Sequence, residues 1–393
     1  MERRDVVIVG GGPAGAATAL FLLRRDPALA GRILVLEKAR HPRTKVCAGG
    51  LIPHTLDCLD ELGVGLRVPH VMVDRAAVDV PAKRVEVEGE RFCAVVRRNE
   101  LDASLIAAVR ARGVAVHEDE KVVSLSRESD GVTLRTTAGA YAARVVVGAD
   151  GSGSLVRRRL VDGDGTREEV ARAVMADIPV GASGWDGHAR ARYDFDFRAV
   201  PRGLAGYAWA FPCLIDGAPH VNAGVYAWHR RPGVDLVALL RELQGTLGGA
   251  EVRHQAAPIR CFGRGRFVTP HVLLVGDAAG VEPLMGEGIS FALEYGRWAA
   301  EEIATALARD DWRFAGAEAR FRAGWTGRKL RRLGQAATMF YGPGARLWLG
   351  LAARWRGGQE VGLRWYNGVD GWDRRSAWDA LKGAVAWSQR VVQ

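Results

Sequence analysis

Val6-Val7-Ile8-Val9-Gly10-Gly11-Gly12-Pro13-Ala14-Gly15 is an apolar run that leads directly into a glycine-rich turn. Such a run is typical of a buried parallel strand. Gly10 allows the tight turn, Gly12 lets the backbone approach a pyrophosphate, and Gly15 lets the following helix pack closely on the strand. Residues 14–23 are predicted to form that helix, whose N-terminus offers free N–H groups to a phosphate. The run therefore predicts a dinucleotide-binding βαβ unit.

A second apolar run, Ile33–Leu36, ends at Glu37. This acid lies about twenty residues beyond the glycines, where the fold presents a carboxylate to a ribose hydroxyl. The alternative is a chance glycine-rich turn between a strand and a helix, but strand, helix, second strand and acid together favour the nucleotide site. Because like charges repel, Glu37 also disfavours a 2′-phosphate at this position.

Two further glycine motifs follow the first in a fixed order. Gly148-Ala149-Asp150-Gly151 lies in the middle of the chain. Gly276-Asp277-Ala278-Ala279-Gly280 comes late and is followed by Pro283-Leu284-Met285-Gly286-Glu287-Gly288-Ile289. One such motif alone is a weak signal, but three in this order indicate a chain wrapped around one FAD molecule. The expected fold class is α/β, and FAD is the expected cofactor.

Each later motif also has a purely structural alternative. Asp277 follows an apolar run, and its carboxylate suits either ribityl hydroxyls or the cap of the next helix; we favour the flavin role. Gly286, Gly288 and Ile289 lie where a long helix begins, so their N–H groups can face the edge of a reduced flavin that becomes negative. A bare tight turn is the alternative there. For Asp150, stabilising its own turn and contacting the cofactor are equally favoured.

The composition allows a full core and shows an uneven charge. The chain has 393 residues and 48% hydrophobic residues, enough for one large or two to three ordinary domains. Its net charge is +10, and residues 326–393 hold twelve Lys/Arg against four Asp/Glu, a net +8. Nine of the twelve tryptophans lie after residue 290. This segment suits an anionic membrane surface, or a solvated helical face whose tryptophans pack inward. Nucleic acid is disfavoured as a partner, because no binding motif accompanies the charge.

Cysteine usage and hydropathy bear on the compartment. The five cysteines are odd in number and scattered, and no C-x-x-C pair occurs: Cys47, Cys58, Cys93, Cys213 and Cys261. No metal site is therefore expected, and reduced thiols in a cytoplasmic protein are the default interpretation. The glycine turn begins at residue 10, which leaves no room for a signal peptide, and no run of eighteen apolar residues predicts a spanning helix. The expected location is cytoplasmic, with a peripheral position on the inner face of the membrane as an option.

The order of predicted strands and helices divides the chain into three parts. A Rossmann-like FAD-binding domain is discontinuous and takes residues 1–75, 93–165 and 263–310. A mostly antiparallel β-sheet domain for substrate is inserted at 76–92 and 166–262. Residues 311–393 are predicted to form a C-terminal helical segment.

Several motifs carry a resemblance to a known family. Lys45-Val46-Cys47-Ala48-Gly49-Gly50 is similar to a K-x-C-G-G segment, with Ala48 where glycine is usual. Tyr207-Ala208-Trp209-Ala210-Phe211-Pro212 is similar to a Y-x-W-x-F-P motif, and Gly286-Glu287-Gly288-Ile289 to a G-E-G-I flavin loop. Arg98, with Leu101-Asp102 behind it, matches an R-x-x-[FL]-D segment whose arginine approaches FAD. Over residues 1 to about 310, the chain resembles the geranylgeranyl reductase family, within the FAD-dependent superfamily of p-hydroxybenzoate hydroxylase.

The motifs and the resemblance together imply a set of residues around FAD: Gly10, Gly12, Pro13, Ala14, Gly15, Glu37, Lys38, Lys45, Cys47, Ala48, Arg98, Gly276, Asp277, Gly286, Gly288 and Ile289. A lone cysteine is usually a small buried hydrophobe. The cation of Lys45 and the neighbouring glycines, with the resemblance, instead favour contact of Cys47 with flavin or substrate. Cys47 is a candidate catalytic proton donor, and Tyr207 is a weaker candidate at its usual pKa.

Three aromatic residues alternate along one predicted strand. Tyr207, Trp209 and Phe211 share one face of it, and Pro212 is expected to end it. They could form plain core. The resemblance implies that they line an apolar cavity over the flavin and contact the substrate.

The leading hypothesis is reduction of C=C bonds in a hydrophobic prenyl chain by hydride transfer from reduced flavin. Electrons would come from NAD(P)H or from a ferredoxin-like donor protein, whose acidity would suit the basic surface. The alternative is a flavin-dependent monooxygenase or halogenase of the same superfamily acting on a secondary metabolite, although the W-x-W-x-I-P pattern of many halogenases is absent. A non-enzymatic flavin scaffold or electron-relay protein is the third hypothesis.

Overall fold

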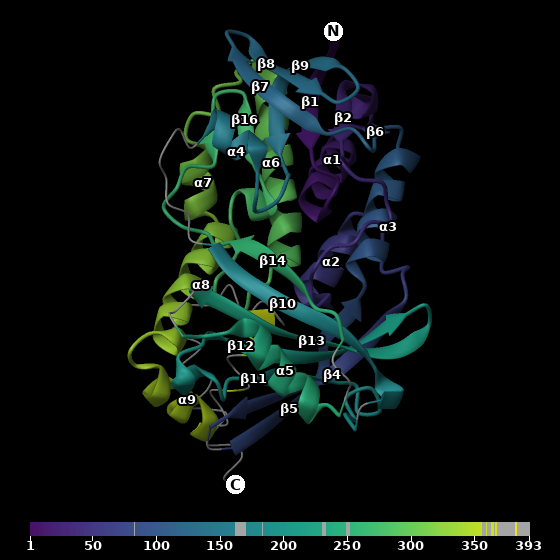
Figure 1. The fold of residues 1–393 in the computed structure, drawn as a ribbon. Coiled ribbons are helices and arrows are strands. Elements are labelled where there is room, and N and C mark those ends of the chain that lie inside the picture. The colour runs from purple at the N-terminus through teal and green to yellow at the C-terminus, as the bar shows by residue number, and fades with distance from the viewer. Residues whose placement is uncertain are drawn as a thin grey trace.

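Two eight-stranded sheets carry the fold, one above the other in Figure 1. The structure is a computed structural model that describes residues 1–81, 83–161, 170–182, 184–229, 233–248, 252–355 and a few later positions: Gln359, Leu363, Arg364, Tyr366, Asn367 and Lys382. The first sheet belongs to a Rossmann-like domain, the second is mostly antiparallel, and helices follow it. This arrangement confirms the predicted α/β fold class.

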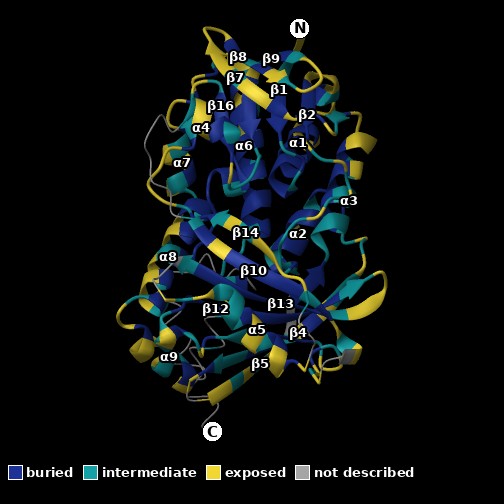
Figure 2. Ribbon diagram, in the orientation of Figure 1, coloured by how far each residue is buried: buried dark blue, intermediate teal, exposed yellow. Residues whose placement is uncertain are grey.

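The strands of the first sheet are β1 (Glu2–Val9), β2 (Ile33–Leu36), β6 (Ala115–His117), β7 (Val122–Glu128), β8 (Gly131–Thr136), β9 (Ala140–Gly148), β15 (Val268–Thr269) and β16 (Val272–Leu274). Their order is β15-β16-β9-β1-β2-β6, with β8 and then β7 attached to β9. The strands from β16 to β6 run parallel, and the register places Val6 between Ile33 and Val145. These strands lie deep in the domain (Figure 2), and burial on both faces explains their continuous apolar runs.

Helices enclose the first sheet: α1 (Pro13–Arg25), η1 (Pro27–Arg32), α2 (Pro53–Glu61), α3 (Arg98–Ala111), α4 (Leu155–Leu160), η4 (Gly276–Ala278) and α6 (Ile289–Arg309). The predicted helix of the glycine-rich motif is α1, and it packs closely along α6. At Gly296 of α6, an added Cβ would lie 2.6 Å from the Cβ of Ala17. A glycine at this crossing therefore allows the two backbones to approach.

The strands of the second sheet are β3 (Gly50–Leu51), β4 (His70–Val80), β5 (Lys83–Val96), β10 (Val170–Pro179), β11 (Arg192–Asp196), β12 (Ala205–Ile215), β13 (Ala218–His229) and β14 (Gln255–Arg260). Their order is β14-β10-β13-β12-β11-β4-β5-β3, and β11 and β4 are the parallel pair among antiparallel neighbours. The sheet takes more of the chain than the predicted 76–92, because β4 begins at His70 and β5 continues to Val96.

Pro212 does not end its strand as predicted, because β12 continues to Ile215. On its β11 side, β12 pairs only over Ala208–Ala210. Pro212 thus lies beyond that ladder, and a proline is tolerated where one side of a strand has no strand partner.

The two faces of the second sheet differ in their neighbours. The helix α5 (Leu236–Thr246) covers one face, where Leu240 and Leu247 pack against Ala223 and Val225. The opposite face carries Tyr207 and the other aromatic side chains. These aromatics share a core with α8 (Trp325–Tyr341) and α9 (Ala345–Arg354).

Helices also dominate the described part of the C-terminal segment. α7 (Ala317–Ala323), α8 and α9 run along one side of the molecule (Figure 1), and the Gly342-Pro343-Gly344 segment separates α8 from α9. Most of the segment predicted as helical beyond residue 355, including Gly357-Gly358, lies outside the described residues. None of the described helices is long and apolar enough to cross a lipid bilayer.

Candidate active site

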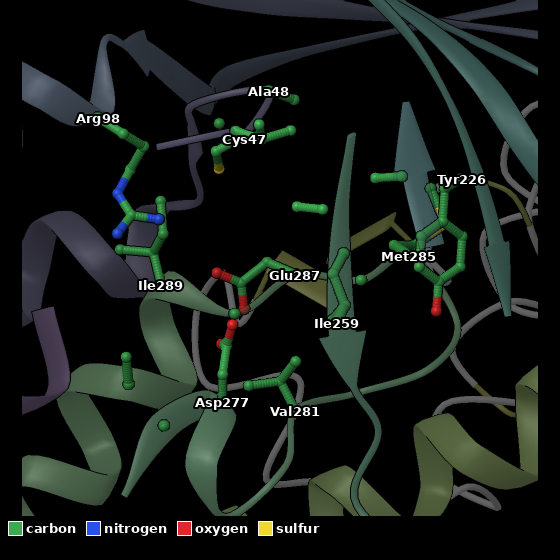
Figure 3. Close-up of a pocket in the computed structure, with 18 of the residues that line it drawn as sticks. Cys47, Ala48, Arg98, Tyr226, Ile259, Asp277, Val281, Met285, Glu287 and Ile289 are labelled. Atoms are coloured by element: carbon green, nitrogen blue, oxygen red, sulfur yellow. The ribbon is translucent and has the colours of Figure 1, made fainter. Parts of the chain in front are cut away.

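One cavity of about 1430 Å³ joins the two sheets. It begins at the carboxyl ends of the parallel strands β1 and β9, where open α/β sheets bind their ligands. Cys47, Arg98 and Glu287 surround its middle (Figure 3), and aromatic and aliphatic side chains of the second sheet, α8 and α9 line its far end. Ordinary ligand pockets enclose about 300–1,000 Å³. The cavity is therefore large enough for a dinucleotide with a second ligand beside it.

The glycine-rich turn has the geometry that its sequence predicts. Gly10 has a φ of +113°, and an added Cβ would lie 2.3 Å from the carbonyl oxygen of Ala149. Gly12 borders the cavity, where a Cβ would meet nothing closer than Arg43 Nη2 at 3.5 Å. Gly15 does not line the cavity. Its added Cβ would lie 2.0 Å from the carbonyl oxygen of Gly10, so it acts through packing rather than through cofactor contact.

Every other residue predicted around FAD lines the cavity: Gly10, Gly12, Pro13, Ala14, Glu37, Lys38, Lys45, Cys47, Ala48, Arg98, Gly276, Asp277, Gly286, Gly288 and Ile289. Their contact with FAD stays a prediction. Asp277 accepts a hydrogen bond from Ser152 Oγ at 3.2 Å, and no helix N–H bonds to it among the described residues. Asp150 fits both of its predicted roles. Its Oδ2 accepts a hydrogen bond from Leu155 N at 2.7 Å and so holds the start of α4. Its Oδ1 is buried beside the cavity and has no hydrogen-bond partner among the described residues.

Charged side chains of alternating sign follow one another along one wall of the cavity, with Asp102 buried behind the lining residues. Glu37 lies 3.5 Å from Arg43, Arg43 lies 3.3 Å from Asp102, and Asp102 lies 2.9 Å from Arg98. Glu37 also accepts from the backbone N–H of Gly11 at 2.8 Å, so it holds the glycine turn in place. Burial alone would lower the pKa of Arg98, but the carboxylate of Asp102 and the sulfur of Cys47 raise it above its usual range. Arg98 therefore remains a cation inside the protein.

Arg43 is a site residue that the sequence did not reveal. It lies far along the chain from Gly12 but beside it in space, and it lines the cavity. Its Nε is buried and faces the Glu37 carboxylate at 3.5 Å, without a hydrogen bond among the described residues. Only its position among basic residues 38–45 gave any signal.

Cys47 lines the middle of the cavity, and a backbone N–H donates to its sulfur. The backbone N–H of Gly49 donates to Sγ at 3.4 Å, and the Arg98 guanidinium interacts electrostatically with the sulfur. Gly49 has a φ of +79°, and an added Cβ would lie 1.9 Å from the carbonyl oxygen of Val96. The glycine after Cys47 is thus needed for the loop to reach the cavity. All five cysteines of the chain are free thiols.

The loop before α6 is built on a buried carboxylate that sequence reasoning missed. Glu282 is fully buried and accepts from the backbone N–H groups of Leu284, Met285 and Glu287, at 2.6 to 3.0 Å. Burial raises its pKa to about 7, although these N–H groups oppose the shift. Nothing in the local sequence distinguishes this acid from a surface residue.

Glu287 and Gly286 complete that loop. The Glu287 carboxylate accepts from Ser290 N at 2.8 Å and so caps α6, and burial raises its pKa. Gly286 has a φ of +68°, and an added Cβ would lie 2.8 Å from the ring of Tyr226. The G-E-G-I segment is therefore a tight, internally bonded turn against the cavity.

The predicted aromatic wall is present. Tyr207, Trp209 and Phe211 are nearly buried and all line the cavity from β12. The hydroxyl of Tyr207 donates to the carbonyl oxygen of Met285 at 2.5 Å, and burial raises its pKa well above the usual value. Both observations disfavour Tyr207 as a proton donor and leave it as a wall residue.

The residues at the first end of the cavity fit FAD. The glycine turn leaves room for a pyrophosphate at Gly12, and the guanidinium of Arg43, whose Nη2 would lie 3.5 Å from a Cβ added at Gly12, places a positive charge beside it. Asp277 and the free oxygen of Asp150 offer acceptors for hydroxyl groups. The observed donors and acceptors thus match a phosphate and polyol chain.

A separate cluster of potential metal ligands lies between α2 and α6. His54, Cys58 and Glu294 approach one another within 4.8 Å. Arg297 places its guanidinium 3.4 Å from Glu294 and 3.6 Å from Cys58. A cation is therefore already supplied to this cluster by the protein.

Comparisons with known proteins give the family. Residues 3–188 match the model of an FAD binding domain. The chain is 32% identical to a menaquinone reductase of Mycolicibacterium smegmatis, over 76% of each chain. It is 31% identical to digeranylgeranylglycerophospholipid reductase 1 of Methanopyrus kandleri, over 78% of this chain and 82% of that one.

Solved structures show the same fold. A geranylgeranyl bacteriochlorophyll reductase-like protein from Thermoplasma acidophilum superposes with a TM-score of 0.75 at 20% identity, covering 98% of this chain and 96% of that one. A flavin-dependent brominase superposes with a TM-score of 0.76 at 20% identity, covering 99% of both. These likenesses concern the fold alone. On the sequence identities, this chain belongs to the geranylgeranyl reductase family of FAD-dependent oxidoreductases.

Proposed function

We propose that this enzyme reduces carbon–carbon double bonds in a prenyl chain. The observation that supports this proposal is the apolar continuation of the cavity beyond Cys47. There, Tyr207, Trp209 and Phe211 face aliphatic residues of β4 and β5 such as Val78 and Val87. A long unsaturated hydrocarbon needs a dry wall of this kind, since apolar surface gains free energy when it leaves water.

The residues that line the cavity have separate roles in the proposed hydride and proton transfer. The glycine turn, Arg43 and Asp277 hold FAD, which when reduced and bound supplies a hydride to one alkene carbon. A proton must reach the other carbon, and the Cys47 thiol is the proposed donor. The thiolate left behind would be stabilised by the Gly49 N–H, which donates to Sγ at 3.4 Å, and by the positive charge of the Arg98 guanidinium. Solvent then returns a proton to the sulfur, and the net addition is one hydrogen molecule per double bond.

The electrons come from outside the chain, and NAD(P)H or a ferredoxin-like protein is the proposed donor. Stopped-flow mixing of the oxidised protein with NADH, NADPH or reduced ferredoxin would identify it by loss of flavin absorbance. Rapid bleaching by one donor and not by the others would assign it.

Single-turnover mass spectrometry tests the reaction itself. The protein is reduced with dithionite without oxygen and mixed with a geranylgeranyl lipid, and a parallel aerobic run contains chloride and bromide. A product heavier by two hydrogens for each reduced bond in the anaerobic run is expected. Cys47→Ser should retain FAD and lose most of this product, whereas the remote Cys213→Ser should retain both.

The same experiment discriminates against the alternative reaction. A product that carries oxygen or halogen and forms only in the aerobic run would show that the enzyme is a monooxygenase or halogenase rather than a reductase. An unchanged lipid in both runs, with FAD bound and reducible, would overturn the prenyl substrate.

A further inference from the structure

The helical hairpin of α8 and α9 carries an unusual number of exposed apolar side chains. In the described part of the chain, eight large hydrophobic residues are exposed, and five of them lie here: Met339, Leu347, Trp348, Leu351 and Trp355. Leu347 is 63% exposed and Leu351 is 49% exposed. Both point outward from the same face of α9, one helical turn apart. Figure 2 shows exposed residues along α8 and α9 on the outer side of the molecule.

The same hairpin is strongly basic. Residues 325–354 contain six Lys/Arg and no Asp or Glu. Arg328, Arg331, Arg346 and Arg354 are exposed. The Arg346 guanidinium reaches the neutral carbonyl oxygen of Pro201 at 3.4 Å, and the acids near that loop are already paired, Asp196 with Arg198 and Glu242 with Arg202. Among the described residues, the two helices that carry the exposed apolar side chains thus also carry exposed arginines, and the structure records no ion pair for these arginines.

The inner face of α9 borders the cavity. Leu349 and Ala353 are buried and line its apolar end together with Ala352, and Phe340 of α8 lies beside them. A single helix thus separates the apolar end of the cavity from the exposed apolar patch. An exposed apolar face with tryptophans and arginines on the same pair of helices is typical of a surface that binds lipid.

We propose that the α8–α9 hairpin docks on an anionic lipid membrane and that the prenyl lipid passes beside α9 from the bilayer into the cavity. Leu347, Trp348 and Leu351 insert at the level of the headgroups, and the arginines bind lipid phosphates. The proposal rests on the proposed function for the identity of the lipid that passes, but membrane docking itself does not.

Flotation of the full-length protein with vesicles tests the docking. Phosphatidylcholine vesicles are compared with vesicles that also contain phosphatidylglycerol. The wild type should float only with the anionic vesicles and should be released by high salt. Leu347→Gln with Leu351→Gln should weaken partitioning about thirtyfold, from the transfer free energy of two half-exposed leucines. Arg346→Gln with Arg354→Gln should weaken it by a similar factor, about fivefold for each charge.

The matched control replaces exposed apolar residues elsewhere. Met72→Gln with Val123→Thr removes two side chains of 47% and 49% exposure from β4 and β7 and should leave flotation unchanged. Equal loss in this control, or no flotation of the wild type, would overturn the proposal. A dimer that Leu347→Gln with Leu351→Gln dissociates, with no flotation of either protein, would instead make the patch an interface between two copies.

Turnover separates this proposal from the proposed function. If docking serves lipid access, Leu347→Gln with Leu351→Gln should slow reduction of a prenyl lipid embedded in vesicles and leave reduction of a short prenyl alcohol in water unchanged. Equal rates on the embedded lipid would overturn the access route. If neither substrate is reduced by the wild type while flotation persists, the proposed function fails and membrane docking stands.

Discussion

Replacing Gly286 with alanine should disrupt the loop before α6, and the cost can be worked out from two features. The φ of +68° is a left-handed conformation, which costs a residue with a Cβ about 1–2 kcal/mol. The new Cβ would also lie 2.8 Å from the Tyr226 ring, which is buried and held by a 2.8 Å bond from its hydroxyl to the Pro283 carbonyl oxygen. Overpacking against a fixed ring costs about 1–3 kcal/mol more. Gly286→Ala should therefore lower the free energy of unfolding by about 2–5 kcal/mol.

Gly217→Ala is the control for the backbone cost alone. Gly217 has a φ of +77° in the turn between β12 and β13, and an added Cβ there meets nothing within 4 Å. It should lose only about 1–2 kcal/mol and bind FAD as the wild type does. Urea unfolding of the FAD-free proteins and fluorescence titration with FAD give both quantities, and Gly286→Ala should weaken FAD binding more than about tenfold. Equal losses in the two variants would refute the role of the Tyr226 contact.

Three further predictions concern buried polar groups. Because burial raises the pKa of Glu282 to about 7, above its value in the unfolded chain, its favourable contribution is complete at low pH and is lost as the pH rises through about 7. Urea titrations should show wild type losing about 3 kcal/mol relative to Glu282→Gln between about pH 5 and 8, and a constant difference would contradict this. Arg98→Met should lower the free energy of unfolding by about 3–5 kcal/mol, measured by thermal unfolding, because the buried Asp102 loses an ion-pair partner. Adding Asp102→Leu should restore much of the lost stability. If it does not, the broken ion pair is not the cause of the loss. Tyr207→Phe should lower the free energy of unfolding by about 1–3 kcal/mol, because the Met285 carbonyl loses its hydrogen bond, and should leave the turnover rate unchanged. A variant that still binds FAD but has lost turnover would show that the hydroxyl takes part in the reaction.

Local sequence patterns were sufficient to predict strands β1 and β2 of the first sheet and the helices α1 and α6. The runs at 6–9 and 33–36 form the parallel strands β1 and β2, and the long helix predicted to begin near Ile289 is α6 (Ile289–Arg309). Burial on both faces of a parallel sheet leaves a strong local signature, and glycines at tight turns leave another. Cys47, Asp277 and Tyr207 could be placed around one cavity because their motifs recur in a known family.

Contacts between distant segments left no such signature. Arg43 meets Gly12, and Glu282 organises a loop by accepting from N–H groups that any sequence would possess. The domain border was also misplaced near His70, since β4 begins in a segment that lacks strict alternation and is held in the second sheet by pairing with β5 and β11. Such features depend on tertiary packing, which overrides local preference.

The tyrosine hydroxyls that meet the loop before α6 have a thermodynamic consequence. Tyr207, Tyr226 and Tyr341 come from β12, β13 and α8, and they donate to the carbonyl oxygens of Met285, Pro283 and Leu284 respectively. The apolar end of the cavity and the loop before α6 are thus joined by the same hydrogen bonds. A ligand that shifts these rings must change the affinity for FAD, and FAD must change the affinity for that ligand by the same factor. Variants selected for a wider cavity would consequently alter cofactor retention as well.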